Sequence, residues 1–300
     1  MKDRSLIIEG DTYTLVKVRN HAPISIYKGK DSFLRIGPED LIQQEVDYHM
    51  NLVRYGFPVP NIISRGTHLG LHYYIESSIG EEHLGQTFAR NSVDSLVSNS
   101  NFALLLDVVK KFAQAQINTT GAQTYQFSDF TNLIQVDTIL AELPVLAPDT
   151  MKAVSLVEKN VTSLPAVLTH GDFNPYNLFE DGVIDWERGS FAPFGYDLIT
   201  NIVQSFFFPL GNDYEFSALY RFSKDQVGEY WRQLDLVCAE HGVDTLSQRR
   251  NDFIFCRSIW SVVRMEKWPR IQAWRYKLYK SLLQSYLRDE DLTQFLLNYK

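Results

Sequence analysis

Residues 167–187 of the chain read VLTHGDFNPYNLFEDGVIDWE. The segment opens with an apolar, strand-forming run that ends at His170 and brings Asp172 to the end of a predicted strand. Two more short strands, at 177–179 and 183–185, are predicted around the turn residues between them. The segment therefore predicts a strand, a polar loop and a hairpin in close succession.

The predicted hairpin determines where two polar side chains point. A three-residue loop with Gly182 in the left-handed conformation pairs Asn177 with Asp185 and places both side chains on one face. A two-residue loop would place them on opposite faces. An amide oxygen and a carboxylate side by side suit Mg²⁺, which prefers oxygen ligands and keeps phosphate oxygens in its shell. We therefore predict the three-residue loop and a magnesium site at Asn177 and Asp185.

Asp172 precedes Asn177 by five residues, which is the spacing of the catalytic aspartate and the metal-binding asparagine in kinase-type phosphoryl transfer. In such a reaction, metal neutralises the charge of the transferred phosphoryl group, and a carboxylate orients the acceptor hydroxyl and takes its proton. Asp172 is the candidate for this carboxylate. Taken singly, Asp172, Asn177 and Asp185 are an ordinary turn aspartate, a cap and a strand end, but their combination favours catalysis.

The motif HGDFNPYN followed by IDWE resembles the signature of aminoglycoside phosphotransferases and the related choline-kinase-like small-molecule kinases, which share the protein-kinase fold. The resemblance implies Asp172 as the catalytic aspartate, and Asn177 and Asp185 as the metal ligands. For His170 it implies a structural role in shaping the loop, which is also the ordinary interpretation of a buried histidine.

Two further acidic residues near this signature are candidates. The segment FGYDL at 194–198 resembles the next motif of the family, in which Asp197 would brace the catalytic loop through hydrogen bonds. An N-cap of the following helix is the alternative role for Asp197. Glu187, just after the predicted metal-binding strand, is a candidate substrate carboxylate, with a solvated strand end as its alternative.

The N-terminal part of the chain resembles the nucleotide-binding lobe of the same family. There, a basic residue on the third strand contacts the α- and β-phosphates and pairs with a glutamate on the next helix; Arg35 and Glu45 occupy these positions. Arginine in place of the better-known lysine is a departure, although a guanidinium still binds phosphate bidentately. Without the resemblance, Arg35 and Glu45 would be read as a surface ion pair of little consequence.

The expected phosphate loop departs further from the family. Residues 19–23 read RNHAP and contain no glycine, although glycine lets a loop approach phosphate closely. Pro23 also removes one amide donor. Ser25 and the neighbouring amides are therefore the expected substitutes.

The segment YYIESS at 73–78 resembles the family's hinge, where backbone groups read the purine base. Glu76 and Ser78 are accordingly assigned to the nucleotide site. An ordinary linker between two parts of the chain is the alternative.

The pattern along the chain changes after this segment. Before it, β-prone runs surround one predicted helix, which starts at Pro38 and is closed by Gly56; after it, helical patterns dominate. We predict an α+β, two-lobed, protein-kinase-like fold. Residues 1–79 would form a nucleotide-binding lobe of antiparallel sheet plus helix, hinge included, and residues 80–300 a larger, mainly helical catalytic and substrate-binding lobe that holds the hairpin.

Composition restricts the class of protein. A chain of 300 residues with 45% hydrophobic and 22% charged residues can bury a core, which argues against a disordered or fibrous protein. A net charge of −7 argues against nucleic acid or an anionic membrane as the partner. Cys238 and Cys256 lack metal-ligand spacing and are expected to be buried thiols. The N-terminal segment does not resemble a signal peptide, and no apolar run is long enough for a membrane span, which predicts a cytoplasmic protein.

Together, these features predict an ATP- and Mg²⁺-dependent kinase that phosphorylates a hydroxyl of a small molecule in a cleft between the lobes, with GTP as an alternative donor. The acidic balance favours an amine-bearing acceptor such as an aminoglycoside, an amino sugar or a choline-like alcohol. A catalytically silent kinase-like protein that binds nucleotide or acts as a scaffold is the second hypothesis, favoured by the missing loop glycines. A metal-dependent hydrolase would need a further cluster of ligands, which the seven histidines do not form.

Overall fold

The computed structural model describes residues 4–19, 22–92, 95–186, 189–210 and 213–299. The chain divides into two compact units. The first contains Met1–Glu82 together with Phe179–Ile184, and the second contains His83–Leu178 together with Asp185–Lys300. The predicted α+β class is confirmed, because the first unit is built on an antiparallel sheet and the second is mainly helical.

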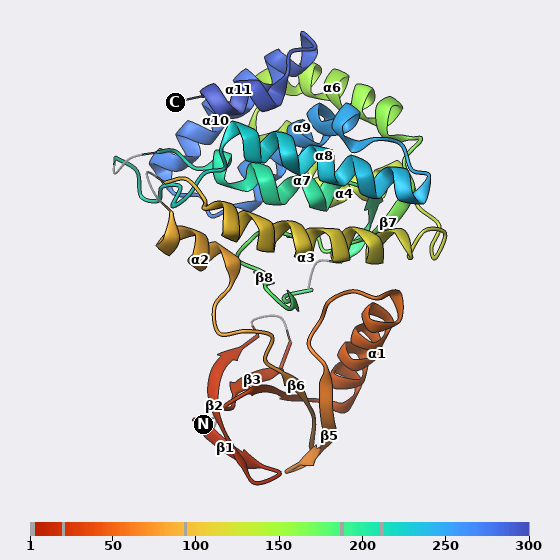
Figure 1. Ribbon diagram of the computed structural model, residues 1–300, viewed down its shortest axis with the longest axis vertical. Coiled ribbons are helices and arrows are strands. Elements are labelled where there is room, and N and C mark those ends of the chain that lie inside the picture. The colour runs from red at the N-terminus through yellow and green to blue at the C-terminus, as the bar shows by residue number, and fades with distance from the viewer. Residues whose placement is uncertain (1–3, 20–21, 93–94, 187–188, 211–212, 300) are drawn as a thin grey trace. The chain divides into compact units, whose positions relative to one another are not determined.

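The first unit holds a curled sheet of six strands (Figure 1). In sheet order these are β1 (Ser5–Ile8), β2 (Asp11–Val18), β3 (Ser25–Lys28), β4 (Ser32–Gly37), β6 (Leu71–Ser77) and β5 (Ile62–His68). All neighbours pair antiparallel. Strand β1 was not predicted: it has only four residues, and its Ile7 is largely exposed. Its pairing with β2 stabilises it.

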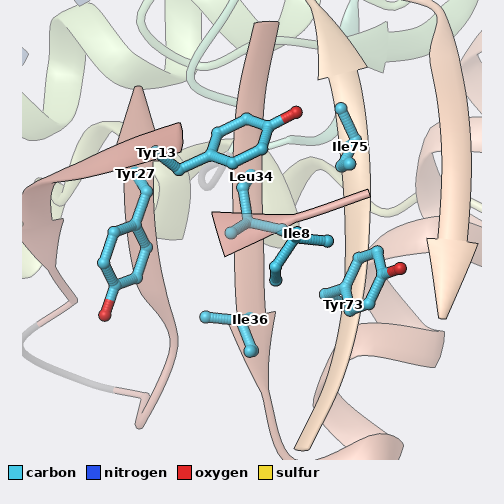
Figure 2. Packing of buried hydrophobic residues seen from close by; sticks show 7 residues of the cluster. All are labelled: Ile8, Tyr13, Tyr27, Leu34, Ile36, Tyr73 and Ile75. Atoms are coloured by element: carbon cyan, nitrogen blue, oxygen red, sulfur yellow. The ribbon is translucent and has the colours of Figure 1, made fainter. Parts of the chain in front are cut away.

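Side chains alternate between the two faces of this sheet, so each strand contributes to two environments. One face carries a hydrophobic core formed by Ile8, Tyr13, Tyr27, Leu34, Ile36, Tyr73 and Ile75 (Figure 2). The other face packs against helix α1 (Glu39–Tyr55), whose Ile42 and Val46 meet Ile24 and Tyr74. As predicted, α1 follows Pro38 and ends at Gly56, which has a φ of 86°. Because Leu34 and Ile36 belong to the first face, Arg35 between them belongs to the face of α1.

The second unit is a bundle of helices with a short pair of strands, β7 (Ala166–Thr169) and β10 (Ser190–Pro193). Its helices are α2 (Leu84–Asn91), α3 (Asn99–Ile117), α4 (Phe127–Ile134), α5 (Val136–Glu142), α6 (Ala147–Val161), α7 (Tyr196–Val203), α8 (Lys224–His241), α9 (Arg250–Arg264), α10 (Pro269–Leu287) and α11 (Leu292–Asn298). Among the described residues of this unit, 3₁₀ turns lie at Pro144–Leu146, Gln204–Phe207 and Leu246–Arg249.

Helix α9 lies at the centre of this bundle. Its residues from Asp252 to Val263 are all buried, and it packs against α10, α7 and α11. A helix buried on every side is expected to be apolar all round, and a charged side chain within it therefore needs a specific partner. Cys256 of this helix and Cys238 of α8 are free and buried, as predicted. Among the helices of the described chain, none combines the length and apolar character needed to cross a membrane.

The strand-rich segment of the sequence provides the second unit with a small sheet. Strand β7 (Ala166–Thr169) pairs antiparallel with β10 (Ser190–Pro193). Between them in sequence, β8 (Leu178–Phe179) and β9 (Gly182–Val183) form a short hairpin, of which Phe179–Ile184 belongs to the first unit. The loop that follows β7 therefore leaves the sheet at a defined point, and this loop carries Asp172.

Candidate active site

Asp172 is held on one side and open on the other. Its Oδ1 accepts a hydrogen bond from Asn174 Nδ2 at 3.0 Å and lies 3.4 Å from Arg257 Nη2. Its other carboxylate oxygen accepts no hydrogen bond from the described residues, and Asp172 lines a pocket. A carboxylate fixed through one oxygen keeps its orientation while the second oxygen stays available to a ligand.

Side-chain amides stabilise the loop after Asp172. The Nδ2 groups of Asn174 and Asn177 donate to the main-chain carbonyl of Asp172, at 3.2 and 2.8 Å. The Oδ1 of Asn174 accepts from the amide of Tyr176 at 2.9 Å. Such local side-chain bonds replace a regular backbone ladder in a tight turn. They bring Asn177 back to the start of the loop, beside Asp172.

Asp197 connects this loop to α7. Its carboxylate accepts hydrogen bonds from the amides of His170, at 2.5 Å, and Gly171, at 3.1 Å. Gln116 Nε2 adds a third contact at 3.3 Å. The N-cap of α7 is Gly195, with a φ of 106°, and not Asp197. Complete burial raises the pKa of Asp197 to about 7, against the opposing effects of the two amide hydrogen bonds and the charge of Arg257.

His170 is buried beneath the loop. Its Nδ1 accepts a hydrogen bond from the amide of Asp172 at 3.3 Å. Its ring packs beside that of Trp186, with the ring centroids 4.9 Å apart. The imidazole therefore contacts the main chain of the loop and an aromatic neighbour.

The hairpin differs from its prediction. Strands β8 and β9 are joined by two residues, Glu180 and Asp181, and not by three. Gly182 does not have a positive φ; a Cβ there would lie 2.8 Å from the carbonyl oxygen of Pro58, which also accepts a hydrogen bond from Val183. The predicted three-residue loop is wrong because Gly182 does not form a left-handed turn; the glycine instead permits a close approach of backbone.

Asp185 itself has the left-handed conformation, with a φ of 66°. Few residues other than glycine adopt this region, although aspartate and asparagine do so more readily than most. Asn177 and Asp185 both lie outside the two strands, so the predicted direct pairing across the hairpin is absent. The turn in the backbone at Asp185, rather than strand register, sets the direction of its carboxylate.

Asn177 and Asp185 carry oxygen atoms suited to a magnesium ion. The amide of Asn177 uses its Nδ2 to bind Asp172, which leaves its Oδ1 without a hydrogen bond from the described chain. Asp185 is exposed and has no ion-pair partner among the same residues. Within the described part of the chain, three or more His, Cys, Asp or Glu side chains do not converge as a metal site. An amide oxygen and one carboxylate fit a magnesium ion that also binds phosphate and water.

A pocket of about 280 Å³ opens beside Asp172 within the second unit. Most of its wall is apolar and is formed by Phe208, Phe216, Trp260, Met265, Trp268 and Ile271. Its polar residues include Asn174, Gln204, Glu266 and Arg275. A pocket of this size with an apolar wall and a few polar groups is typical of a site for a small molecule.

In the first unit, Arg35 forms a different ion pair from the one predicted. Its Nε donates to Glu76 Oε1 at 2.8 Å, whereas the sequence analysis paired it with Glu45. The register places Arg35 opposite Tyr74, so Glu76, two residues further along β6, lies on the same face. Burial opposes the charge of Arg35, but the nearby Glu76 carboxylate and the Tyr74 and Glu45 side chains hold its pKa above the ordinary value.

Glu45 of α1 binds other partners. It forms an ion pair with Arg19 and accepts a hydrogen bond from the hydroxyl of Tyr74 at 3.1 Å. Burial raises the pKa of Tyr74 above its ordinary value against the opposing charge of Arg35, and the carboxylates of Glu76 and Glu45 add to the increase. Arg35, Glu45, Tyr74 and Glu76 thus form one polar cluster on the face covered by α1.

The remaining predicted residues have varied positions. Ser25 begins β3 and is buried. Ser78 donates through its hydroxyl to the carbonyl of Gly80 at 3.1 Å, and its amide binds the carbonyl of Asp31. The amide of Ser77 likewise binds Asn61, so two amides of the predicted hinge are already engaged. Glu187, and residues 20–21 of the predicted phosphate loop, lie outside the described residues.

Sequence reasoning missed two residues that contact Asp172. Asn174 stands inside the quoted motif, and an Asx residue two positions after an aspartate is a recognisable turn signal. Arg257 follows Asp172 by 85 residues, and its Nη2 also binds Gln204 at 2.7 Å. The available signal was a lone arginine within the apolar run FIFCRSIWSVV of α9, where an unpaired charge would be costly.

A sequence profile described as the phosphotransferase enzyme family matches residues 26–234. This match covers more than half of the chain. The chain belongs to this phosphotransferase family. The match begins in β3 and ends in α8, so it includes the ion pair of Arg35, the loop of Asp172 and the hairpin, but it ends before Arg257.

Solved structures resemble this family member in fold. A choline/ethanolamine kinase family protein from Mesorhizobium loti matches 90% of this chain and 88% of its own, with 14% identity and a TM-score of 0.55. The aminoglycoside phosphotransferase APH(3'')-Id from Streptomyces rimosus, solved with ADP and streptomycin, matches 83% and 92%, with 14% identity and a TM-score of 0.48. At such low identity the likeness concerns the fold, and the kinase-like architecture predicted from sequence is confirmed. No curated protein matches the chain.

Proposed function

We propose that this phosphotransferase is an ATP- and Mg²⁺-dependent kinase that transfers the γ-phosphoryl group to a hydroxyl of a small molecule. One observation carries the proposal: Asp172 is fixed through Oδ1 by Asn174 and Arg257, while its second oxygen is open beside an apolar pocket. A small alcohol in that pocket can place its hydroxyl against the open oxygen. The family membership supplies the reaction class.

In the proposed reaction, Asp172 orients the acceptor hydroxyl and accepts its proton as the oxygen attacks. The oxygen forms a bond to the γ-phosphorus, the bond from this phosphorus to the β–γ bridging oxygen breaks, and ADP leaves with that oxygen. Acid–base assistance of this kind contributes about 10²- to 10⁴-fold in rate. Asn174 and Arg257 are positioning residues, because they act through the Asp172 carboxylate.

Asn177 and Asp185 are the proposed ligands of Mg²⁺. Their oxygen atoms are free of protein partners in the described chain, which supports this assignment. When bound, Mg²⁺ neutralises negative charge on the phosphate oxygens. His170 and Asp197 are proposed to support the loop that carries Asp172, through the hydrogen bonds to its main chain.

Arg35 is the proposed phosphate-binding cation of the first unit. Its ion pair with Glu76 keeps the guanidinium charged and restricts its position. Ser25 and Ser78 remain proposed contacts of the nucleotide, and Glu45 is proposed to stabilise the same polar cluster through Arg19 and Tyr74. Since the amides of Ser77 and Ser78 are engaged, the carbonyls of this segment are the groups proposed to read the base.

The proposed acceptor class is an amine-bearing alcohol, such as an aminoglycoside, an amino sugar or a choline-like compound. Glu266, an exposed carboxylate among the residues of the pocket, is available to an amine. The name of the choline/ethanolamine kinase family protein is consistent with this class. Glu187 keeps its proposed role as a substrate carboxylate from the sequence alone.

The test is a screen for acceptor-dependent ADP formation from ATP, with aminoglycosides, amino sugars, choline, homoserine and simple sugars as acceptors. The Asp172→Asn variant is the control, because it retains the shape of the side chain but removes the proton acceptor. We expect turnover that needs Mg²⁺ and falls at least about 100-fold in the variant. Full activity of Asp172→Asn would contradict the role of Asp172.

A catalytically silent, nucleotide-binding protein is the second candidate, because glycine is absent from residues 19–23. Under this alternative the chain would bind ATP or GTP without transferring phosphate to any acceptor. Nucleotide binding measured with and without Mg²⁺, alongside the acceptor screen, separates the two candidates.

A further inference from the structure

The pocket beside Asp172 contains a buried guanidinium that no carboxylate of the described residues neutralises. Arg275, in α10, lines the pocket and is 3% exposed. Its Nη1 donates to the main-chain carbonyl of Glu266 at 2.9 Å, and its Nε is buried without a partner. The guanidinium carbon lies 5.3 Å from the ring centroid of Phe208.

This arrangement is costly for the protein alone. Burial lowers the pKa of Arg275 to about 10, so the side chain is still charged at neutral pH. A buried charge that lacks an opposite charge destabilises the folded state, and a carbonyl and an aromatic ring compensate for only part of that cost. The fold therefore retains a cation at the pocket without giving it an anion.

Arg257 provides the contrast within the same site. It is equally buried, but its guanidinium binds Gln204 and faces the carboxylate of Asp172. The charge of Arg257 is therefore compensated within the protein by the carboxylate of Asp172. Arg275 has no equivalent partner in the described chain, so its charge is available to a ligand.

We infer that the acceptor carries an anionic group, a carboxylate in its simplest form, that pairs with Arg275 while an apolar part of the molecule packs against Trp260 and Trp268. The inference rests on the proposed function, since it takes this pocket as the acceptor site. A guanidinium binds a carboxylate through charge-assisted hydrogen bonds of defined geometry. The acceptor is then a hydroxy acid, and an amine on the same molecule is compatible through Glu266.

Matched pairs of compounds isolate the anionic group. In 3-phenyllactate and 1-phenylpropan-2-ol, a carboxylate is exchanged for a methyl group, and both retain the hydroxyl and an aromatic ring. Homoserine and 3-aminopropan-1-ol form a second pair, without the ring. Binding is measured from the fluorescence of the full chain, whose Trp260 and Trp268 line the pocket, with and without ADP and Mg²⁺. We expect the acid of at least one pair to bind about tenfold or more tightly than its partner.

Three variants connect this preference to Arg275. Arg275→Gln is expected to remove the preference for the acid, and Arg275→Lys is expected to retain part of it because it keeps the charge. Lys280→Gln is the matched control, because it removes one positive charge from an exposed position of the same helix. Thermal unfolding of each variant verifies that it is folded.

The outcomes separate this inference from the proposed function. Equal affinities within both pairs, no binding by either acid up to about 10 mM, or a preference that survives Arg275→Gln would overturn the inference. Since the wild-type pairs alone can overturn it, the test does not depend on the stability of a variant. Acids that bind through Arg275 but are never phosphorylated from ATP would contradict the proposed function and leave the anion site standing.

Discussion

Arg257 Nη2 lies 3.4 Å from Asp172 Oδ1, and the arginine side chain is only 1% exposed. Its guanidinium carbon also lies 3.4 Å from the centroid of the Trp260 ring, which restricts it to one position. A rigid cation against one oxygen of a carboxylate determines which way the second oxygen points. This contact between α9 and the loop after β7 is therefore the feature that orients Asp172.

Replacing Arg257 should reduce the rate of transfer more than substrate binding. We expect Arg257→Met to lower kcat about 10- to 100-fold with little change in the KM for ATP, because Asp172 loses its orientation. Arg257→Lys should recover part of kcat. Steady-state kinetics of both variants measure this, with Arg232→Met, an exposed position on α8, as the control. A change confined to KM would show that Arg257 does not act through Asp172.

Asp185 can be tested without disturbing its backbone. Asparagine tolerates the left-handed conformation almost as well as aspartate, so Asp185→Asn removes only the negative charge at a φ of 66°. We expect the affinity for ADP in the presence of Mg²⁺ to fall about 10- to 100-fold, and the affinity without Mg²⁺ to stay the same. Fluorescent ADP titrations measure both. Asp181→Asn, in the neighbouring turn, is the control, and an equal effect there would count against a metal site.

The ion pair of Arg35 with Glu76 predicts that these two residues stabilise the protein jointly, and more than Arg35 and Glu45 do. Glu76→Gln leaves a buried guanidinium without its anion and should reduce the free energy of unfolding by about 3 kcal/mol. In double-mutant cycles with Arg35→Met, the coupling energy should be larger for Glu76 than for Glu45, which binds Arg19. Urea unfolding gives these energies. A larger coupling to Glu45 would restore the pairing expected from sequence.

Two glycine substitutions should change the free energy of unfolding in opposite directions. Gly182→Ala brings a Cβ to 2.8 Å from the carbonyl oxygen of Pro58, so this carbonyl must move and its hydrogen bond from Val183 weakens. We expect a loss of about 1–3 kcal/mol in the free energy of unfolding. Gly228→Ala, in α8 with no atom within 4 Å, should stabilise the protein by about 0.5–1 kcal/mol. Chemical denaturation compares the two, and equal effects would rule out the close approach as the reason for Gly182.

The raised pKa of Asp197 predicts that the free energy of unfolding depends on pH. Its pKa is raised from 3.8 to about 7 in the folded state, mainly by burial, so the folded protein binds its proton more tightly than the unfolded chain does. Its contribution to stability is fully present below about pH 4 and is lost as the pH rises through about 7, with a maximum of about 4 kcal/mol. The stability of the wild type relative to Asp197→Asn should therefore fall between these pH values.

Urea unfolding of both proteins from pH 4 to pH 8 measures this difference. Asparagine cannot accept both amide hydrogen bonds through oxygen, so Asp197→Asn should also lower stability at every pH by about 1–3 kcal/mol. The comparison between pH values removes this constant cost. A difference that stays constant, or that grows as the pH rises, would contradict the raised pKa.

The local features of the fold could be predicted because neighbouring residues determine them. Pro38 and Gly56 flank α1 as expected. Proline disfavours a helical conformation of the residue before it, so the helix begins after it, and glycine adopts the left-handed conformation of the C-cap. The strand before His170 and the polar loop around Asp172 were likewise readable within a few residues. The loop of the hairpin could not be predicted, because the reason for Gly182 is its close contact with the backbone of Pro58, which is distant in sequence.

The α+β class, the course of α1 and the motif from Asp172 to Asp185 could be predicted from sequence, because spacing and backbone preference act over a few residues. The groups that surround these residues depend on how distant segments pack. Arg35 pairs with Glu76 because β4 and β6 are neighbours in a register that places both on one face. Arg257 faces Asp172 from a helix 85 residues later in the chain. Such partners are selected by packing between distant segments, and no local pattern encodes that packing.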